Sequence, residues 1–447
     1  MNSRLKMILR LVFIFIFSFL VLEFIAYPIA NGDPIANYCF SHALVMGEIP
    51  YKDFNLISTP LYTFIMSIGL LVFDNYLIFI LEQSILITIL FYFLFKMYDE
   101  KTWFILLSMA LPLFYPFSAT YNFLCLFFII LIVYFEKNYP DKDYLIGLLI
   151  GLASLSKHTT GLFLLIPLII IYYKDLRKLL KRFIGILIPV LIFLIYLIIT
   201  KSLFNFIDLS FLGLFDFAGN NTNLKNIYLY LILLVSILLF SLIIKNKKKK
   251  YNYYFLVIIT ICIPLFDLIH FSLLFVSFII VLLDNIKIKN NLYITSIIVL
   301  ILFSSLYFIC INTRDALFYK DVNHFNYMYN LKYDYLMNKK TFNYFDRYKD
   351  RNNIILSSHT MMYDITRDNN INYFDVLLYG NSGYNGTKKL IRKMNKEKNL
   401  YIIVDMNKYE ESINNKKSQY DTKVIDYVLN NYKLIEEEGI FRVYYKK

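Results

Sequence analysis

The stretch that decides the fold is an uninterrupted apolar run of 17 residues, FIGILIPVLIFLIYLII, at positions 183–199. The run carries no charge, and basic residues flank it: Lys181 and Arg182 precede it and Lys201 follows it. A helix needs about 20 apolar residues to cross the hydrocarbon core of a bilayer, within a range of about 17–25. The run therefore predicts a membrane-spanning helix.

The composition of the whole chain agrees with this reading. Hydrophobic residues make up 58% of the chain, aromatic residues make up 19%, and the mean hydropathy is +0.53. A soluble domain is only about 45–50% apolar. Further apolar runs predict an α-helical polytopic membrane protein with about eleven transmembrane helices. The predicted spans are 7–27, 76–95, 102–117, 119–135, 143–157, 159–173, 183–199, 226–244, 252–266, 269–284 and 291–311.

The basic residues predict the orientation of these spans. With the N-terminus inside, 19 Lys and Arg residues fall in cytoplasmic segments, and four fall in outer loops. This distribution follows the positive-inside rule and accounts for the net charge of +13 without a nucleic-acid partner. Counting the apolar segment 60–73 as a further span would place the basic run Lys245–Lys250 outside. We therefore expect 60–73 to form an interfacial or re-entrant helix.

The composition changes after Ile311, where the chain becomes polar and charged. Alternating short patterns predict strands and helices in this part. The expected strands are Asn353–Ser357, Leu400–Val404 and a closing pair within Lys433–Tyr445, and the expected helices are Thr387–Lys396 and Gln419–Leu429. The sequence thus predicts a transmembrane domain at 1–312 and a small α/β domain at 313–447. An odd number of spans places the α/β domain outside the cell.

The first outer loop, at 28–60, is the most informative connection. Its sequence from Asn31 to Pro60 is NGDPIANYCFSHALVMGEIPYKDFNLISTP. Loops of this length are often functional. An acidic residue, Asp33, follows the first helix, and the loop then continues through Tyr38 to the motif Gly-x-x-Pro-Tyr-x-Asp-Phe, which contains Asp53. Two later stretches share this character, Gly147–Pro167 and Pro264–His270.

These patterns resemble those of the GT-C glycosyltransferases, which are integral membrane enzymes that use polyprenyl-phosphate sugars. Within that superfamily the chain looks most like bacterial relatives of the protein O-mannosyltransferases and the aminoarabinose transferases. The resemblance implies an inverting hexosyltransferase that moves a sugar from a lipid-phosphate donor to an acceptor at the outer face of the plasma membrane. The first loop carries one Asp where the O-mannosyltransferases have an adjacent Asp-Glu pair. The acceptor therefore stays open between a glycan, a lipid and a protein.

The resemblance also implies roles for particular residues. Asp33 matches the loop position of the general base that deprotonates the acceptor hydroxyl. The alternative is that Asp33 only caps a helix that begins with Asp33-Pro34. Cations must neutralise the departing polyprenyl phosphate, and the candidates are Lys157, His158 and Arg314. The alternative for each of these is an anchor at the membrane interface.

Polar side chains must also bind the sugar or the acceptor, and here we expect Asp267, His270, Asp53 and Tyr38. Asp267 and His270 are spaced i, i+3 and so share one face of a helix. The alternative is a structural Asp–His hydrogen bond that links two helices. Asp53 is expected to be either a supporting carboxylate or a turn residue.

Cofactor use stays open. Mg²⁺ or Mn²⁺ are the candidate metals, with Asp33 as a ligand if there is one. Two other functions compete with the transferase: a transporter or flippase for lipid-linked glycans, and a polymerase of surface glycans. Transporters usually show repeated halves and charges near the middle of the bilayer. This sequence shows no repeated halves. Its polar motifs lie in the predicted outer loops and not near the middle of the bilayer.

Overall fold

The computed structural model of the chain describes most of its length in two compact units. The first unit comprises Met1–Ile29, Leu77–Phe193 and Leu224–Lys320, and the second comprises Ala30–Tyr76, Leu194–Asn223 and Asp321–Lys447. The residues that the structure describes are 3–22, 33–73, 76–98, 120–221, 227–246, 248–263, 266–285, 347–348, 350–357, 377–414 and 420–446. The predicted spans 102–117 and 291–311, and Arg314, lie outside these ranges.

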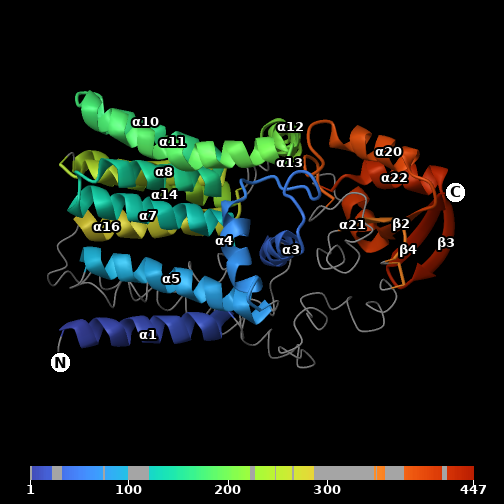
Figure 1. The fold of residues 1–447 in the computed structure, drawn as a ribbon, viewed down its shortest axis with the longest axis horizontal. Coiled ribbons are helices and arrows are strands. Elements are labelled where there is room, and N and C mark those ends of the chain that lie inside the picture. Colours follow the sequence, from blue (N-terminus) through green and yellow to red (C-terminus); the bar gives the residue numbers. More distant parts are fainter. Residues whose placement is uncertain are drawn as a thin grey trace. The chain divides into compact units, whose positions relative to one another are not determined.

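Unit 1 is a bundle of apolar helices, which Figure 1 shows lying side by side. Its longer helices are α1 (Ser3–Val21), α5 (Tyr76–Tyr98), α7 (Tyr121–Asn138), α8 (Asp143–Ser156), α11 (Leu176–Ile199), α14 (Ile227–Lys245) and α16 (Leu268–Asn285). Two shorter helices are α9 (His158–Phe163) and α10 (Leu165–Tyr172). Among the described residues, four helices are long and apolar enough to cross a membrane, within α5, α7, α11 and α14.

The predicted span 252–266 does not form one regular α-helix. A 3-10 turn, η4 (Lys250–Asn252), leads into a short α15 (Tyr253–Leu256), and a second 3-10 stretch, η5 (Val257–Cys262), follows. Five of the six residues of η5 are β-branched, in the sequence Val-Ile-Ile-Thr-Ile-Cys. Branching at Cβ restricts the side-chain rotamers in an α-helix and lowers the preference for that conformation.

Unit 2 begins with the first loop. Helix α3 (Asp33–Val45) starts at Asp33, and α4 (Leu61–Leu70) falls within the segment predicted to be interfacial. At 1.5 Å per residue, ten residues extend roughly 15 Å, which is half the thickness of a hydrocarbon core. Helix α4 alone is therefore too short to cross a bilayer. After α11 the chain continues through α12 (Leu203–Ile207), the π-helical turn η3 (Asp208–Leu212) and α13 (Gly213–Asn221).

The C-terminal part of unit 2 is a four-stranded sheet with helices (Figure 1). Its strands and two of its described helices match the predicted elements closely, whereas the helix Met406–Asn414 was not predicted. The strands are β1 (Asn353–Leu356), β2 (Leu400–Asp405), β3 (Lys433–Glu438) and β4 (Phe441–Lys446), and the helices are α20 (Gly386–Lys396), α21 (Met406–Asn414) and α22 (Thr422–Asn431). The strand order is β1-β2-β4-β3, with β1 parallel to β2 and the other neighbours antiparallel. Strand β2 is central and mostly buried, with Ile402, Ile403 and Val404 fully enclosed.

Candidate functional site

Lys157 occupies the single extended residue between α8 and α9, with φ −145° and ψ 99°. Helix α9 then folds back along α8. The two backbones approach so closely that a Cβ atom on Gly161 would lie 2.1 Å from the Cα atom of Ser154. Only glycine fits such an approach. The tight hairpin therefore fixes where Lys157 emerges from the helix end.

The ammonium group of Lys157 is held by neutral oxygen atoms. Its Nζ atom donates to Asn122 Oδ1 at 2.8 Å and to the Ile261 carbonyl at 3.3 Å, and it lies 5.7 Å from the centre of the Tyr121 ring. The residue is only 9% exposed. A buried ammonium is costly unless polar groups receive it, so these contacts position the charge at a defined place. Asn122 lies in the first turn of α7 and Ile261 lies in η5, so three separate segments meet at this charge.

Asp267 and His270 form a close pair at the start of α16. Asp267 Oδ1 accepts hydrogen bonds from the His270 backbone N–H at 2.9 Å and from His270 Nδ1 at 2.7 Å. The Asp267 side chain is 40% exposed, whereas that of His270 is 7% exposed. The contact lies within one helix end, so the expected alternative of a bond linking two helices is not what the structure shows. Asp267 caps α16 and at the same time orients the imidazole ring.

Cys262 connects this pair with the lysine. Its thiol donates to the His270 carbonyl at 3.4 Å, and it lies within electrostatic range of both Lys157 and Asp267. The structure thus brings Lys157 together with Asp267 and His270, which lie more than 100 positions later in the chain. We call this group, together with Asn122, the lysine site.

Two residues of α9 add polar groups next to Lys157. His158 is the first residue of α9 and is 7% exposed. The Thr160 hydroxyl is buried and makes no hydrogen bond within the part of the chain that the structure describes. Buried hydroxyl groups normally have a partner, which is water or a ligand when the protein supplies none.

The candidate residues of the first loop belong to unit 2. Asp33 is the first residue of α3, and its side chain lies outside the described atoms. Tyr38 is fully buried and stacks on the His42 ring, with 5.8 Å between the ring centres. Asp53 accepts a hydrogen bond from the Ile49 backbone N–H at 2.8 Å. This contact closes a turn, which is one of the two roles expected for Asp53.

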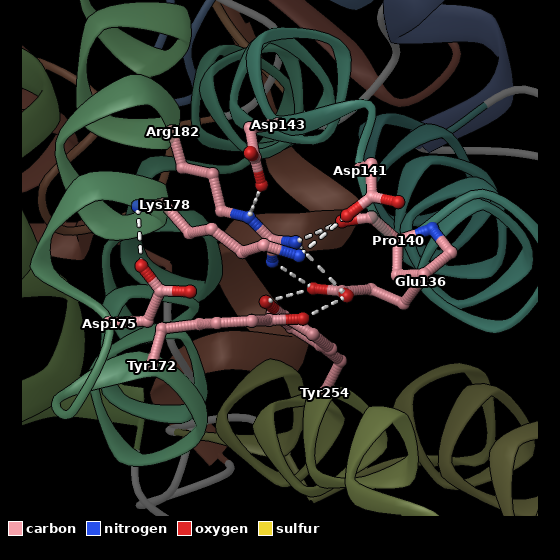
Figure 2. A network of polar contacts seen from close by, with 9 residues as sticks. All are labelled: Glu136, Pro140, Asp141, Asp143, Tyr172, Asp175, Lys178, Arg182 and Tyr254. Carbon is pink, nitrogen blue, oxygen red and sulfur yellow. Dashed lines mark hydrogen bonds and ion pairs between the residues drawn. The ribbon is translucent and has the colours of Figure 1, made fainter.

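A second polar cluster was not expected from the sequence, in which Arg182 was only one cytoplasmic charge among many. Figure 2 shows Arg182 at its centre. The guanidinium group donates from Nε to Asp143 Oδ1 at 2.9 Å and from Nη2 to the Pro140 carbonyl at 3.1 Å. It also forms a two-pronged ion pair with Glu136, and the side chains of Arg182 and Glu136 are 0% and 2% exposed.

Two tyrosines complete this cluster. The Tyr172 hydroxyl donates to Glu136 Oε2 at 2.6 Å, and the Tyr254 hydroxyl donates to Glu136 Oε1 at 2.9 Å. The Arg182 guanidinium also lies 3.8 Å from the centre of the Tyr172 ring. The cluster joins the end of α7 to the starts of α8 and α11, whereas the lysine site lies at the opposite ends of α7 and α8. The available signal was a charge directly next to a predicted apolar span, Glu136 after 119–135 and Arg182 before 183–199, but the sequence does not say which partner each charge finds.

Metal binding receives no support from the described side chains. No group of three or more His, Cys, Asp or Glu residues within them is arranged to hold a metal ion. The side chain of Asp33, the only metal ligand that the sequence suggested, is not among them.

Comparisons with known proteins give one structural likeness. No protein-family model matches the chain, and no curated protein matches its sequence. The solved structure of ArnT from Cupriavidus metallidurans, bound to undecaprenyl phosphate, matches with a TM-score of 0.57 at 9% sequence identity. The match covers 99% of this chain and 98% of that chain. The chain therefore has the same fold as that structure.

Proposed function

We propose that this protein is a membrane glycosyltransferase that moves a sugar from a polyprenyl-phosphate donor to an acceptor at the outer face of the membrane. The observation that carries the proposal is the buried, positioned ammonium of Lys157, in a chain that shares its fold over 99% of its length with a protein crystallised with undecaprenyl phosphate. The finer details of the proposal, namely the donor, the acceptor and the base, rest on the chemistry of the residues.

Lys157 is assigned to the phosphate of the donor. A phosphate oxygen is a stronger hydrogen-bond acceptor for an ammonium than the amide and carbonyl oxygens that now hold it. The positive charge would stabilise the negative charge that builds up on the phosphate as the sugar leaves. His158 and Arg314 are assigned to the same phosphate as further cations, and the buried Thr160 hydroxyl is assigned as a further hydrogen-bond donor.

Asp33 is assigned as the general base. In the transfer step the acceptor hydroxyl gives its proton to the carboxylate while its oxygen bonds to the anomeric carbon. The bond from that carbon to the phosphate oxygen breaks, and the polyprenyl phosphate leaves with the electron pair. One carboxylate is sufficient for this inverting step, because phosphate leaves without a strong acid. The position of Asp33 at the first residue of α3 supports the assignment, because a helix N-terminus is a favourable place for negative charge.

The Asp267–His270 pair is assigned to the hydroxyl groups of the sugar. A half-exposed carboxylate whose neighbour fixes its orientation is a suitable acceptor for such hydroxyls. Tyr38 and Asp53 of the first loop are assigned to supporting roles in the binding of the acceptor. The charge distribution supports an orientation with the N-terminus in the cytoplasm and the C-terminal α/β domain outside a plasma membrane that the chain crosses several times.

A transfer assay with two lysine variants tests this proposal. Membranes containing the parent, Lys157→Met or Lys174→Met are given labelled polyprenyl-phosphate hexoses, and labelled product is followed with time. Lys174 is exposed and lies at the opposite helix ends, so it controls for the loss of one positive charge. We expect transfer by the parent and by Lys174→Met, and a loss of at least roughly tenfold in Lys157→Met. Equal rates in both variants would remove the phosphate role from Lys157.

A further inference from the structure

The helical segment from Leu203 to Asn221, which follows α11 in unit 2, presents two different faces. We call this segment, made of α12, η3 and α13, the bridging helix. One face is apolar and exposed: Phe204 is 83% exposed, Phe215 is 72% exposed, and Ile207 and Phe211 lie between them at helical spacing. Large apolar side chains gathered on one exposed stripe usually meet another apolar surface.

The other face of the bridging helix binds the C-terminal part of the same unit. Asp208 accepts a hydrogen bond from the Tyr384 backbone N–H at 3.3 Å and pairs with Lys389 Nζ at 2.5 Å. Asp216 accepts a hydrogen bond from the Asn385 backbone N–H at 2.7 Å. Both carboxylates thus point at the N-terminus of α20, where free backbone N–H groups favour negative charge.

Glycines permit this contact. A Cβ atom on Gly380 would lie 2.7 Å from the Gly213 carbonyl oxygen, and one on Gly383 would lie 2.3 Å from Asp208 Oδ2. Gly380 and Gly383 also have positive φ angles of 92° and 79°, which side-chain-bearing residues rarely adopt. The first loop also contacts the turn that contains Gly380 and Gly383, because Asn55 Nδ2 donates a hydrogen bond to the Asn381 carbonyl at 3.0 Å.

The exposed stripe continues an apolar surface that is already suited to lipid. The last turns of α11 expose Ile195, Ile198 and Ile199, and only the turn at Thr200–Ser202 separates them from Phe204. Helix α11 is one of the helices long and apolar enough to span a membrane. Lys201 in the turn is exposed, as expected for a basic residue at the level of the lipid headgroups.

A second exposed apolar element lies at the same end of α11. Phe64 of α4 makes an edge-to-face contact with Tyr196 of α11, with 5.4 Å between the ring centres. Directly after α4, Leu71, Val72 and Phe73 are each at least 65% exposed. The apolar stripe of the bridging helix and the apolar residues after α4, both beside the end of one spanning helix, fit a bilayer surface better than a single protein partner.

We propose that the bridging helix lies in the lipid interface at the end of α11 and holds the C-terminal α/β domain on the membrane surface through Asp208 and Asp216. The apolar stripe enters the lipid, and the carboxylates of Asp208 and Asp216, on the opposite face, bind the N-terminal end of α20. This role is independent of sugar transfer, and so it is tested without an activity assay.

Tryptophan fluorescence tests the lipid contact in the full-length protein in bilayers. The chain has one tryptophan, Trp103, so Trp103→Phe gives a silent background for Phe204→Trp, Phe215→Trp and the control Leu434→Trp. Leu434 is an exposed apolar residue of β3 and is 44% exposed. We expect brominated lipids to quench the emission at 204 and 215 but not at 434, and iodide to do the reverse. Quenching of the emission at 204 and 215 by iodide alone would overturn the lipid assignment. Emission that neither agent quenches, in a protein that forms an oligomer, would also overturn it.

Amide hydrogen exchange tests the contact between Asp208 and the start of α20. We expect Asp208→Ala to speed exchange across residues 384–389, and the charge swap Asp208→Lys with Lys389→Asp to restore only part of the protection, because a lysine at position 208 cannot accept the Tyr384 backbone N–H. The matched swap pairs Asp208→Lys with Lys388→Asp, since Lys388 is exposed and adjacent. Parent-like exchange in Asp208→Ala, or equal rescue by both swaps, would overturn the assignment.

Discussion

Replacing Arg182 with methionine is expected to destabilise the helix bundle strongly. Methionine keeps much of the length of the side chain but removes the charge and every hydrogen bond that the guanidinium donates. Glu136 and Asp143, which are 2% and 4% exposed, would then be buried carboxylates without their cation. Removing one partner of a buried ion pair typically costs about 3–5 kcal/mol.

A matched variant isolates the effect of burial. Lys178 lies one helical turn before Arg182 and pairs with Asp141 at 2.7 Å, but the two side chains are 29% and 87% exposed. An exposed ion pair of this kind contributes about 0–1 kcal/mol. We therefore expect Lys178→Met to lower the free energy of unfolding by at most about 1 kcal/mol. The difference from Arg182→Met is then at least roughly 2 kcal/mol.

The assay is reversible unfolding of the purified proteins in mixed micelles, with the fraction unfolded followed against the mole fraction of denaturing detergent. A loss of about 3 kcal/mol changes the folding equilibrium by roughly 160-fold, which such a titration resolves easily. Equal midpoints for Arg182→Met and Lys178→Met would refute the reasoning that the buried cluster stabilises the bundle.

Three further variants are expected to behave as follows. Tyr254→Phe removes one hydroxyl that donates to Glu136 and should cost about 1.5–3 kcal/mol in the same titration, with a parent-like midpoint as the contrary result. Gly147→Ala places a Cβ atom 2.1 Å from the Arg182 carbonyl oxygen, so it should push α8 from α11 and cost about 1–3 kcal/mol, seen as a lower melting temperature. Burial raises the pKa of Asp421, so its contribution to stability is complete below the unfolded pKa of about 3.9 and is lost as pH rises through the folded pKa. Asp421→Asn should remove that loss, measured as pH-independent protection of α22 from hydrogen exchange, and an unchanged pH dependence would contradict it.

The elements whose signals are local were predictable from the sequence. The predicted strand Leu400–Val404 is β2, which ends one residue later, and the predicted helix Thr387–Lys396 is α20, which begins one residue earlier. Both have strong patterns of their own: β2 is a short apolar run, and α20 has a narrow apolar stripe among charged residues. The start of α3 at Asp33 is equally local, because Asp-Pro is a common beginning for a helix.

Pairings between distant segments were not predictable. Nothing in the sequence around Arg182 specifies that it meets Glu136, 46 positions earlier, in place of water or lipid headgroups. Asp208 and Lys389, which are 181 positions apart, meet only because the backbones at Gly213 and Gly380 touch. The lysine site was predictable in part. Lys157, Asp267 and His270 could be singled out as candidates from the sequence, whereas their meeting around Cys262 depends on how α9, η5 and α16 pack.

The central claim is that this chain transfers a sugar from a polyprenyl phosphate with Asp33 as the base. The most direct measurement is the transfer rate of the purified protein in proteoliposomes with labelled polyprenyl-phosphate hexoses and candidate acceptors, comparing the parent with Asp33→Asn. The account predicts transfer by the parent and a loss of roughly 100-fold or more in a correctly inserted Asp33→Asn. Transfer at the parent rate by Asp33→Asn would contradict the assignment of the base. Movement of the intact lipid-linked sugar across the bilayer, with no transfer, would contradict the transferase itself.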